Sequence, residues 1–306
     1  MAFANHLHKA SPNVVQFGTT SSKYLCVEGQ SDKNVIARLL PCKDNNLIIT
    51  NVMGDTSKVE FWNPSIDDID HAKERVKHSC KYLRVHGLID RDDPRYVQVP
   101  EKCYVTDHWD LEATMFHEGG IEYVSKLLAG LVATRKDVPA PIVSSFYSNL
   151  LDLASELNRL LISNVFRTSF IGKNGQPKVR NDYGSICTRL DTLTGQPPSN
   201  ANIPIIINRV LEAYGKSTTM DIRPGRYEIG DINGHLTVTA FAILVKNHLT
   251  LTDYLNDEQI GDDWQRLSLQ VIKRQIENQI ERYTTPPLNK TRMFKQLISG
   301  LSLTMK

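Results

Sequence analysis

The stretch Leu25–Asp32, which reads Leu-Cys-Val-Glu-Gly-Gln-Ser-Asp, predicts a buried β-strand that turns into a helix. Its apolar residues favour the strand, and the strand delivers the carboxylate of Glu28 at its end. Gly29 permits a sharp turn, and Ser31 can cap a helix that opens at Asp32. The stretch therefore predicts a strand, a turn and a helix, with an acidic residue at the turn.

A second acidic motif follows 62 positions after Glu28, where the apolar run Val85–Ile89 ends in Asp90-Arg91-Asp92. Two carboxylates at positions i and i+2 that leave a strand together can reach one cation if the loop stays extended. The two motifs predict a site of three acids, Glu28, Asp90 and Asp92, around one hard metal ion. The alternative is a strand-end acid that caps a helix and an ordinary acidic turn before Pro94.

The first third of the chain alternates between strand and helix patterns. Strands are expected at residues 23–27, 47–52 and 84–89, with a fourth at 96–99 or 102–105, and helices at 32–40 and 65–80. This alternation predicts an α/β fold with a parallel sheet, in which ligands bind at the carboxyl ends of the strands. The predicted acids all lie at such ends.

After about residue 118 the pattern changes to long amphipathic helices, expected at 121–132, 143–165, 205–214, 235–248 and 263–283. Residues 166–182 instead read as a turn-rich loop with basic residues around it. We therefore predict two domains, an α/β catalytic domain at residues 1–117 and a mainly α-helical domain at 118–306. The helical domain would contact a partner, a second copy or a substrate.

Composition sets weaker bounds on function. A chain of 306 residues with 41% apolar residues can bury a full core. The formal charge is +2, but residues 264–306 contain eight Lys or Arg and only two Glu. A basic end beside an acidic centre suits a protein that acts on nucleic acid, although a solvated helical face gives the same count.

Cysteine usage and hydropathy indicate the compartment. The five cysteines include no Cys-x-x-Cys pair, so neither a structural zinc site nor a disulfide framework is expected. Residues 1–13 lack the apolar core of a signal peptide, and no apolar run approaches the length of a membrane span. We expect a reduced, cytoplasmic protein without membrane contact.

The motif Glu28-Gly29-x-x-Asp32, followed by Asp90-Arg91-Asp92 on a later parallel strand, resembles the TOPRIM domain over roughly residues 20–115. The resemblance implies that Glu28 acts as a general acid or base or as a metal ligand. It implies that Asp90 and Asp92 hold Mg²⁺, with Mn²⁺ as an alternative, and that Asp32 is a supporting carboxylate. The expected reaction is metal-dependent phosphodiester cleavage.

Two shorter elements narrow the resemblance. Asp110-Leu111-Glu112 is similar to the Asp-Ile-Glu element of OLD-like TOPRIM proteins, and Asn233-Gly234-His235 is similar to another feature of that group. The set looks most like the AriB family, the effectors of PARIS anti-phage systems. Without the resemblance, the first element reads as a carboxylate pair at a helix start, and the second as a turn before a helix.

The AriB resemblance carries expectations about partners and site residues. It implies an ABC-type ATPase that holds the effector until a phage trigger releases it, a homodimer when active, and cleavage of host tRNA. Asp110 and Glu112 would support the acidic site. Lys33, Arg91, Lys173 and Arg180 are candidates for substrate binding.

Two alternatives remain at this point. The chain could be a DNA nickase or nuclease of the OLD type, which shares the acidic motifs. It could also be a catalytically inert module whose helices dock on an ATPase or on a second copy. Three acids that converge at strand ends argue against the inert module, because an unused site has no physical reason to keep them.

Overall fold

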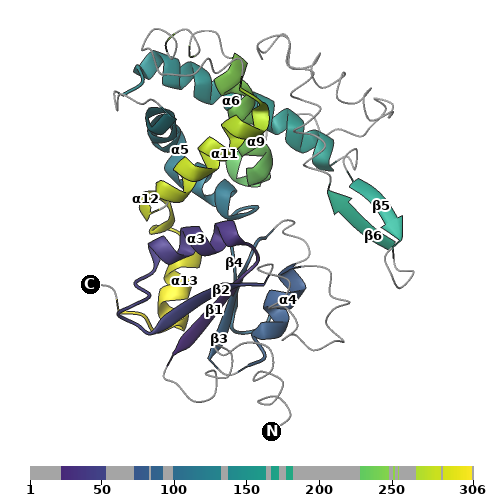
Figure 1. Ribbon diagram of the computed structural model, residues 1–306, viewed down its shortest axis with the longest axis vertical. Coiled ribbons are helices and arrows are strands. Elements are labelled where there is room, and N and C mark those ends of the chain that lie inside the picture. The colour runs from purple at the N-terminus through teal and green to yellow at the C-terminus, as the bar shows by residue number, and fades with distance from the viewer. Residues whose placement is uncertain are drawn as a thin grey trace. The chain divides into compact units, whose positions relative to one another are not determined.

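A computed structural model describes residues 22–52, 72–82, 84–91, 99–131, 137–162, 167–171, 177–181, 228–247, 251, 254, 267–283 and 285–304 (Figure 1). The chain divides into two compact units. The first contains residues 1–114 together with 284–306, and the second contains residues 115–283. The C-terminal segment therefore belongs to the same unit as the N-terminal third.

The first unit is built on a four-stranded parallel sheet with the order β2-β1-β3-β4. The strands are β1 (Lys23–Val27), β2 (Leu47–Asn51), β3 (Val85–Ile89) and β4 (Cys103–Val105). Strands β1 and β3 are neighbours although the whole of β2 separates them in sequence. Because all four strands run the same way, the residues that follow β1 and β3 lie side by side at the carboxyl end of the sheet.

The predicted α/β fold with a parallel sheet is confirmed for this unit. Of the two positions considered for the fourth strand, the structure has β4 in the range 102–105. Helix α4 (Ala72–Ser79) lies against β1 and β3. Its predicted first turns, residues 65–71, lie outside the described residues.

Helix α3 (Gln30–Leu39) begins two residues earlier than predicted, and Ser31 is not its cap. Gly29 occupies the N-cap position in an extended conformation, and Asp32 is the third helical residue. The Asp32 carboxylate accepts a hydrogen bond from the Gly29 backbone N–H at 2.8 Å. Asp32 takes the capping role expected of Ser31, because a side chain at the third helical position can reach back and accept a hydrogen bond from the N-cap backbone N–H.

The C-terminal segment forms α12 (Thr285–Leu288) and α13 (Arg292–Gly300), and α13 packs on β4. The sequence-based division had placed these residues in the helical domain. Their apolar side chains Met293, Phe294 and Leu297 are buried. An amphipathic helix needs a surface on which to bury such a face, and β4, at the edge of the sheet, needs a cover.

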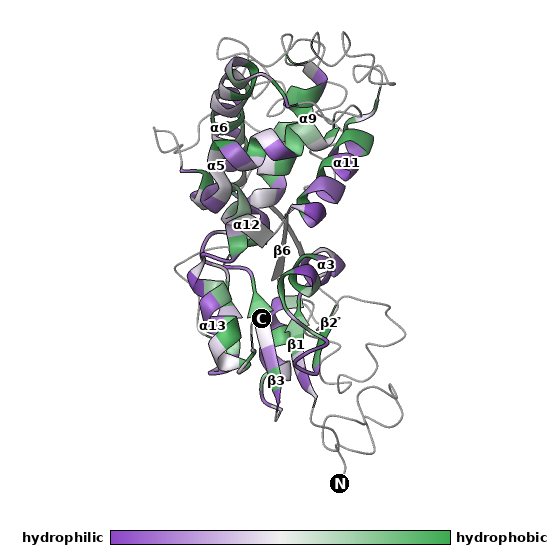
Figure 2. Cartoon of the chain, turned by 90° about the vertical axis from the view of Figure 1, so that its left-hand side faces the viewer, coloured by the Kyte–Doolittle hydropathy of each residue, from purple (hydrophilic) through white to green (hydrophobic). Residues whose placement is uncertain are grey.

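The second unit is mainly helical, as expected. It contains most of α5 (Leu111–Leu131), α6 (Ala140–Ile162), α9 (Gly234–Asn247) and α11 (Leu269–Arg282), and α9 packs against both α6 and α11. Figure 2 shows α9 as largely apolar and α11 with a polar side. The rings of Phe146 and Phe241 meet at 4.8 Å between centroids, which places the centre of this core between α6 and α9.

Two features of this unit differ from the sequence-based expectation. Helix α5 is kinked at Gly120, whose φ of 51° favours glycine. The expected loop at 166–182 contains an antiparallel hairpin, β5 (Arg167–Ile171) and β6 (Pro177–Asn181). The residues that carry the turn signals, 172–176, lie outside the described residues. The helix expected at 205–214 lies outside the described residues.

None of the helices in the ranges given above combines the length and apolar character needed to cross a lipid bilayer.

Candidate acidic site

Glu28 and Asp90 meet at the carboxyl ends of β1 and β3. The Glu28 Oε1 atom accepts a hydrogen bond from the backbone N–H of Asp90 at 2.8 Å. Both residues are half-buried. The pairing of β1 with β3 thus turns a separation of 62 residues into a direct contact, as the two motifs predicted.

Four carboxylates act on the charge of Asp90. Burial raises the pKa of Asp90 well above its ordinary value, and four neighbouring acids raise it further. In decreasing order of effect these acids are Asp32, Glu28, Asp110 and Glu112. A carboxylate resists ionisation when it loses water and faces other negative charges. The site therefore has a strong excess of negative charge.

Asp110 and Glu112 are the most deeply buried of the group, with exposed fractions of 2% and 6%. The Asp110 Oδ1 atom accepts a hydrogen bond from the Ala113 backbone N–H at 2.7 Å, so Asp110 caps the start of α5. The alternative interpretation of Asp110 as a helix-start carboxylate is thus correct for its hydrogen bond. Its charge nevertheless belongs to the group around Asp90.

Thr106 organises this site, and the sequence analysis missed it. Its side chain is 1% exposed. The Oγ1 atom accepts a hydrogen bond from the Arg91 backbone N–H at 3.0 Å and donates one to the His108 carbonyl oxygen at 2.9 Å. Thr106 therefore ties the loop after β3 to the loop that leads into α5. A small hydroxyl residue directly after a strand was the only signal that could have indicated this role.

The donor chemistry of the acidic group fits a hard divalent cation. Carboxylate oxygens are the ligands that Mg²⁺ and Ca²⁺ take in proteins, and a cation would offset the charge that raises the pKa of Asp90. Among the described residues, such an ion would draw its ligands from Glu28, Asp90, Asp110 and Glu112, that is, from Asp90 and three of the acids that act on its charge. Asp92, the third predicted ligand, lies outside the described residues.

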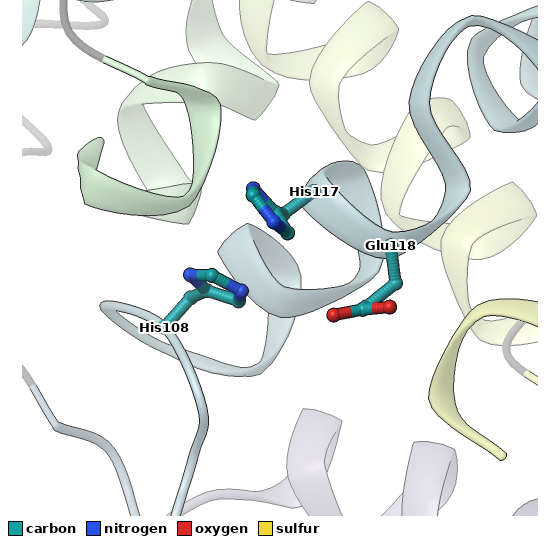
Figure 3. A group of neighbouring side chains, drawn as sticks. All are labelled: His108, His117 and Glu118. Carbon is teal, nitrogen blue, oxygen red and sulfur yellow. The ribbon is translucent and has the colours of Figure 1, made fainter. Parts of the chain in front are cut away.

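The structure also contains a group of possible metal ligands of a different kind. His108, in the loop before α5, and His117 and Glu118, on α5, have ligand atoms that all lie within 4.8 Å of one another (Figure 3). A search of the described residues for three or more His, Cys, Asp or Glu side chains with ligand atoms this close to one another identifies this group. His117 and Glu118 are exposed. Imidazole and carboxylate together suit Zn²⁺ or another transition metal better than Mg²⁺.

The four predicted substrate-binding residues belong to different parts of the chain. Arg91 directly follows Asp90, and Lys33 lies half-buried on α3. Arg180 belongs to β6 of the second unit, and Lys173 lies outside the described residues. The sequence did not predict which unit each of these residues belongs to, because a basic residue by itself does not indicate the unit in which it folds.

The Asn233-Gly234-His235 element has a structural role at Asn233. The Asn233 side chain is buried, and its Oδ1 atom accepts a hydrogen bond from the Leu236 backbone N–H at 3.1 Å, so it caps α9. The Asn158 side chain in turn accepts from the Asn233 backbone N–H at 3.1 Å and donates to the Asp231 carbonyl at 3.2 Å. His235 is exposed.

A comparison of the chain with protein-family models gives no match, and a comparison with curated proteins gives none either.

Proposed function

We propose that this chain is a metal-dependent endonuclease of the TOPRIM type that acts as a toxic effector in anti-phage defence. The observation that carries the proposal is the hydrogen bond that joins Glu28 to Asp90 at the ends of β1 and β3. Burial, together with Asp32, Glu28, Asp110 and Glu112, also raises the pKa of Asp90. A cluster of this kind at the carboxyl ends of parallel strands is where an α/β fold binds ligands. Perturbed acids also concentrate at functional sites.

Each acid has a distinct task in this proposal. A bound Mg²⁺ or Mn²⁺ would neutralise charge on a phosphodiester and orient a water nucleophile. Asp90, Asp110 and Glu112 would hold that ion. The hydrogen bond from the Asp90 N–H fixes the orientation of the Glu28 carboxylate, which suits Glu28 to ligate the ion or to move a proton. Asp32 adds charge while it secures the turn at Gly29.

The defence role rests on the AriB resemblance and not on the acidic cluster. In this proposal an ABC-type ATPase holds the protein inactive, and the released effector dimerises and cleaves host tRNA. Asp110 and Glu112 support it in one respect, because both contribute to the acidic group around Asp90. A DNA nickase would use the same carboxylates, so the substrate has to be measured.

The test compares purified wild-type protein with the Glu28→Gln and Asp90→Asn variants on tRNA and on supercoiled plasmid, in Mg²⁺ and in EDTA. Glu122→Gln, an exposed acid of α5, is the matched control. We expect tRNA cleavage that needs Mg²⁺, survives in the control, and is lost in both site variants by a factor of about 10² or more. Cleavage of plasmid alone would favour the DNA nuclease. Normal ATPase binding without Mg²⁺ binding or cleavage would favour the inert module.

A further inference from the structure

A groove with a volume of about 900 Å³ lies within the first unit, between β4 and α13. Its volume is near the upper end of the range for ligand pockets, about 300–1,000 Å³. Strand β4 contributes Tyr104 to the lining, and α13 contributes Arg292 and Lys295. Arg91, from the loop after β3, lines it as well. Nothing in the proposed chemistry at the acidic cluster uses this groove.

Helix α13 presents one polar face to the groove. Arg292, Lys295 and Ser299 follow one another at three- and four-residue intervals, all line the groove, and all are exposed. Residues at this spacing lie on the same side of a helix. The opposite side of α13 holds Met293 and Leu297, which are fully buried. The basic side chains are therefore held toward the groove by a helix anchored in the core.

Among the described residues that line the groove, positive charges outnumber negative ones. Arg91, Arg292 and Lys295 face two acids, Glu101 and Asp107. The Asp107 carboxylate already accepts hydrogen bonds from the backbone N–H groups of Arg292, at 2.6 Å, and of Met293, at 3.2 Å. Its charge is thus directed to the N-terminus of α13. Among the described residues, none pairs with the side chain of Arg91, Arg292 or Lys295 at ion-pair distance.

The groove reaches the acidic site through Arg91. This residue directly follows Asp90, and Thr106 holds its backbone N–H. A strand of nucleic acid with one phosphate at the acidic cluster could therefore continue along a surface that carries three cations. Lys and Arg side chains of this kind supply most of the sequence-independent affinity for nucleic acid.

We infer that the groove between β4 and α13 binds the phosphate backbone of the nucleic-acid substrate next to the cleavage site. The inference rests on the proposed function for the identity of the ligand. Recognition there is of backbone and not of bases, because Tyr104, the one aromatic residue among the described residues of the lining, is already engaged. Its ring stacks on His86, and its hydroxyl hydrogen-bonds to His86 Nδ1 at 3.0 Å.

The experiment measures binding of a fluorescent single-stranded RNA oligonucleotide by anisotropy, in EDTA and over a range of salt concentrations. Arg292→Ala with Lys295→Ala is compared with wild type. We expect the double variant to bind at least about tenfold more weakly. We also expect the slope of log K against log salt to shrink by about 1.4, which corresponds to about 0.7 for each of two lost phosphate contacts.

The matched control is Lys43→Ala with Lys290→Ala. It removes the same charge from exposed positions of the first unit that do not line the groove. Its RNA affinity should stay close to that of wild type. Ser299→Glu keeps both basic residues and adds a negative charge to the groove, so it should also weaken binding. If the double alanine variant does not fold, the Ser299→Glu variant tests the same groove.

Three results would overturn the inference. These are an unchanged salt slope in the double variant, an equal loss in the control, or tighter binding of an acidic peptide of matched charge than of RNA. The last result would assign the groove to a protein partner. Because binding is measured in EDTA, the outcome does not depend on cleavage. A failed nuclease assay with an intact groove effect would count against the proposed chemistry alone.

Discussion

At the scale of single residues, Asp90 and Thr106 decide the shape and charge of the site. Burial and the negative charges of four other acids raise the pKa of Asp90. Thr106 joins the loop that follows Asp90 to the loop that leads to Asp110. The negative charge around Asp90 therefore favours cation binding, and the hydrogen bonds of Thr106 hold the loops of the site in place.

Asp90→Asn should stabilise the metal-free protein and abolish its stabilisation by Mg²⁺. The folded-state pKa of Asp90 is raised, so the fold disfavours its ionised form. The stability of metal-free wild type should therefore fall as pH rises from about 4, the unfolded pKa, through the folded pKa. The Asn variant should lack this part of the pH dependence.

Thermal unfolding in EDTA and in Mg²⁺, at several pH values, checks this expectation. Mg²⁺ at about 100 times its Kd should stabilise wild type by about 2.7 kcal/mol and leave Asp90→Asn unchanged. Glu122→Gln is again the control. Equal Mg²⁺ stabilisation of wild type and Asp90→Asn would remove Asp90 from the metal site.

Thr106→Val should destabilise the first unit by about 1–3 kcal/mol, because it leaves the Arg91 N–H and the His108 carbonyl without their partner in a buried place. Thr106→Ser keeps the hydroxyl and should retain most of the stability. Urea denaturation gives the difference. If the Val and Ser variants unfold alike, the hydroxyl is not what secures the two loops.

At the scale of elements, residues in β4 and just after it contact both ends of α13. Asp107 accepts from the first N–H groups of α13, and the Thr291 side chain accepts from the Phe294 N–H at 3.0 Å. At the other end, the Tyr104 hydroxyl lies so close to Gly300 that an added Cβ atom would meet it at 1.8 Å. An added methyl group would therefore require the Tyr104 ring or the end of α13 to shift.

Asp107→Ala should cost about 0.5–2 kcal/mol, the usual effect of losing an N-terminal cap. Asp107→Asn retains an accepting oxygen and should cost less. Hydrogen exchange of the amides of Arg292 and Met293 should accelerate in the Ala variant, because these are the groups that Asp107 binds. Unchanged exchange at these amides would show that the cap contributes little.

Gly300→Ala should destabilise the first unit by about 1–3 kcal/mol, because the new methyl group forces the Tyr104 ring or α13 to move. Ser299→Ala, at the neighbouring exposed position, is the control and should be nearly neutral. Chemical denaturation of both variants measures the difference. A Gly300→Ala variant as stable as wild type would mean that the end of α13 is loosely held.

At the scale of the whole molecule, the first unit is formed by two separate segments of the chain, residues 1–114 and 284–306. Lys23 on β1 donates to the carbonyl oxygens of Leu301 and Ser302. Asn45 exchanges two hydrogen bonds with the Thr304 backbone, at 2.7 and 3.2 Å. Buried Leu297 and Leu301 extend the core of the same unit. The first unit is therefore completed only by the last residues of the chain.

Leu297→Ala should cost about 2–5 kcal/mol, as for other fully buried leucines, and should reduce the stability of the first unit specifically. Hydrogen exchange resolved along the chain should show faster exchange in β1, β3 and β4 and no change in α9. The exposed neighbour Gln296→Ala is the control. Faster exchange in α9 alone would contradict the assignment of α13 to the first unit.

Much of the fold could be predicted because the signals are local. Apolar runs bounded by glycine and acidic residues indicated β1, β2 and β3 to within a residue or two, and the alternation with helices indicated a parallel sheet. Glu28 and Asp90 followed from the same patterns. The hairpin of β5 and β6 was missed, because short strands beside a strong turn signal read as part of the loop.

The sequence by itself determined which acids stand at strand ends, since that depends only on the order of apolar and polar residues along the chain. Only the tertiary structure decided that β1 lies beside β3, that Thr106 ties the two loops, and that α13 covers β4 and forms the groove. Such contacts join residues far apart in the sequence, as do Asp107 and Met293, which are 186 positions apart. Local propensity carries no information at that range, because such pairings depend on the packing of the whole core.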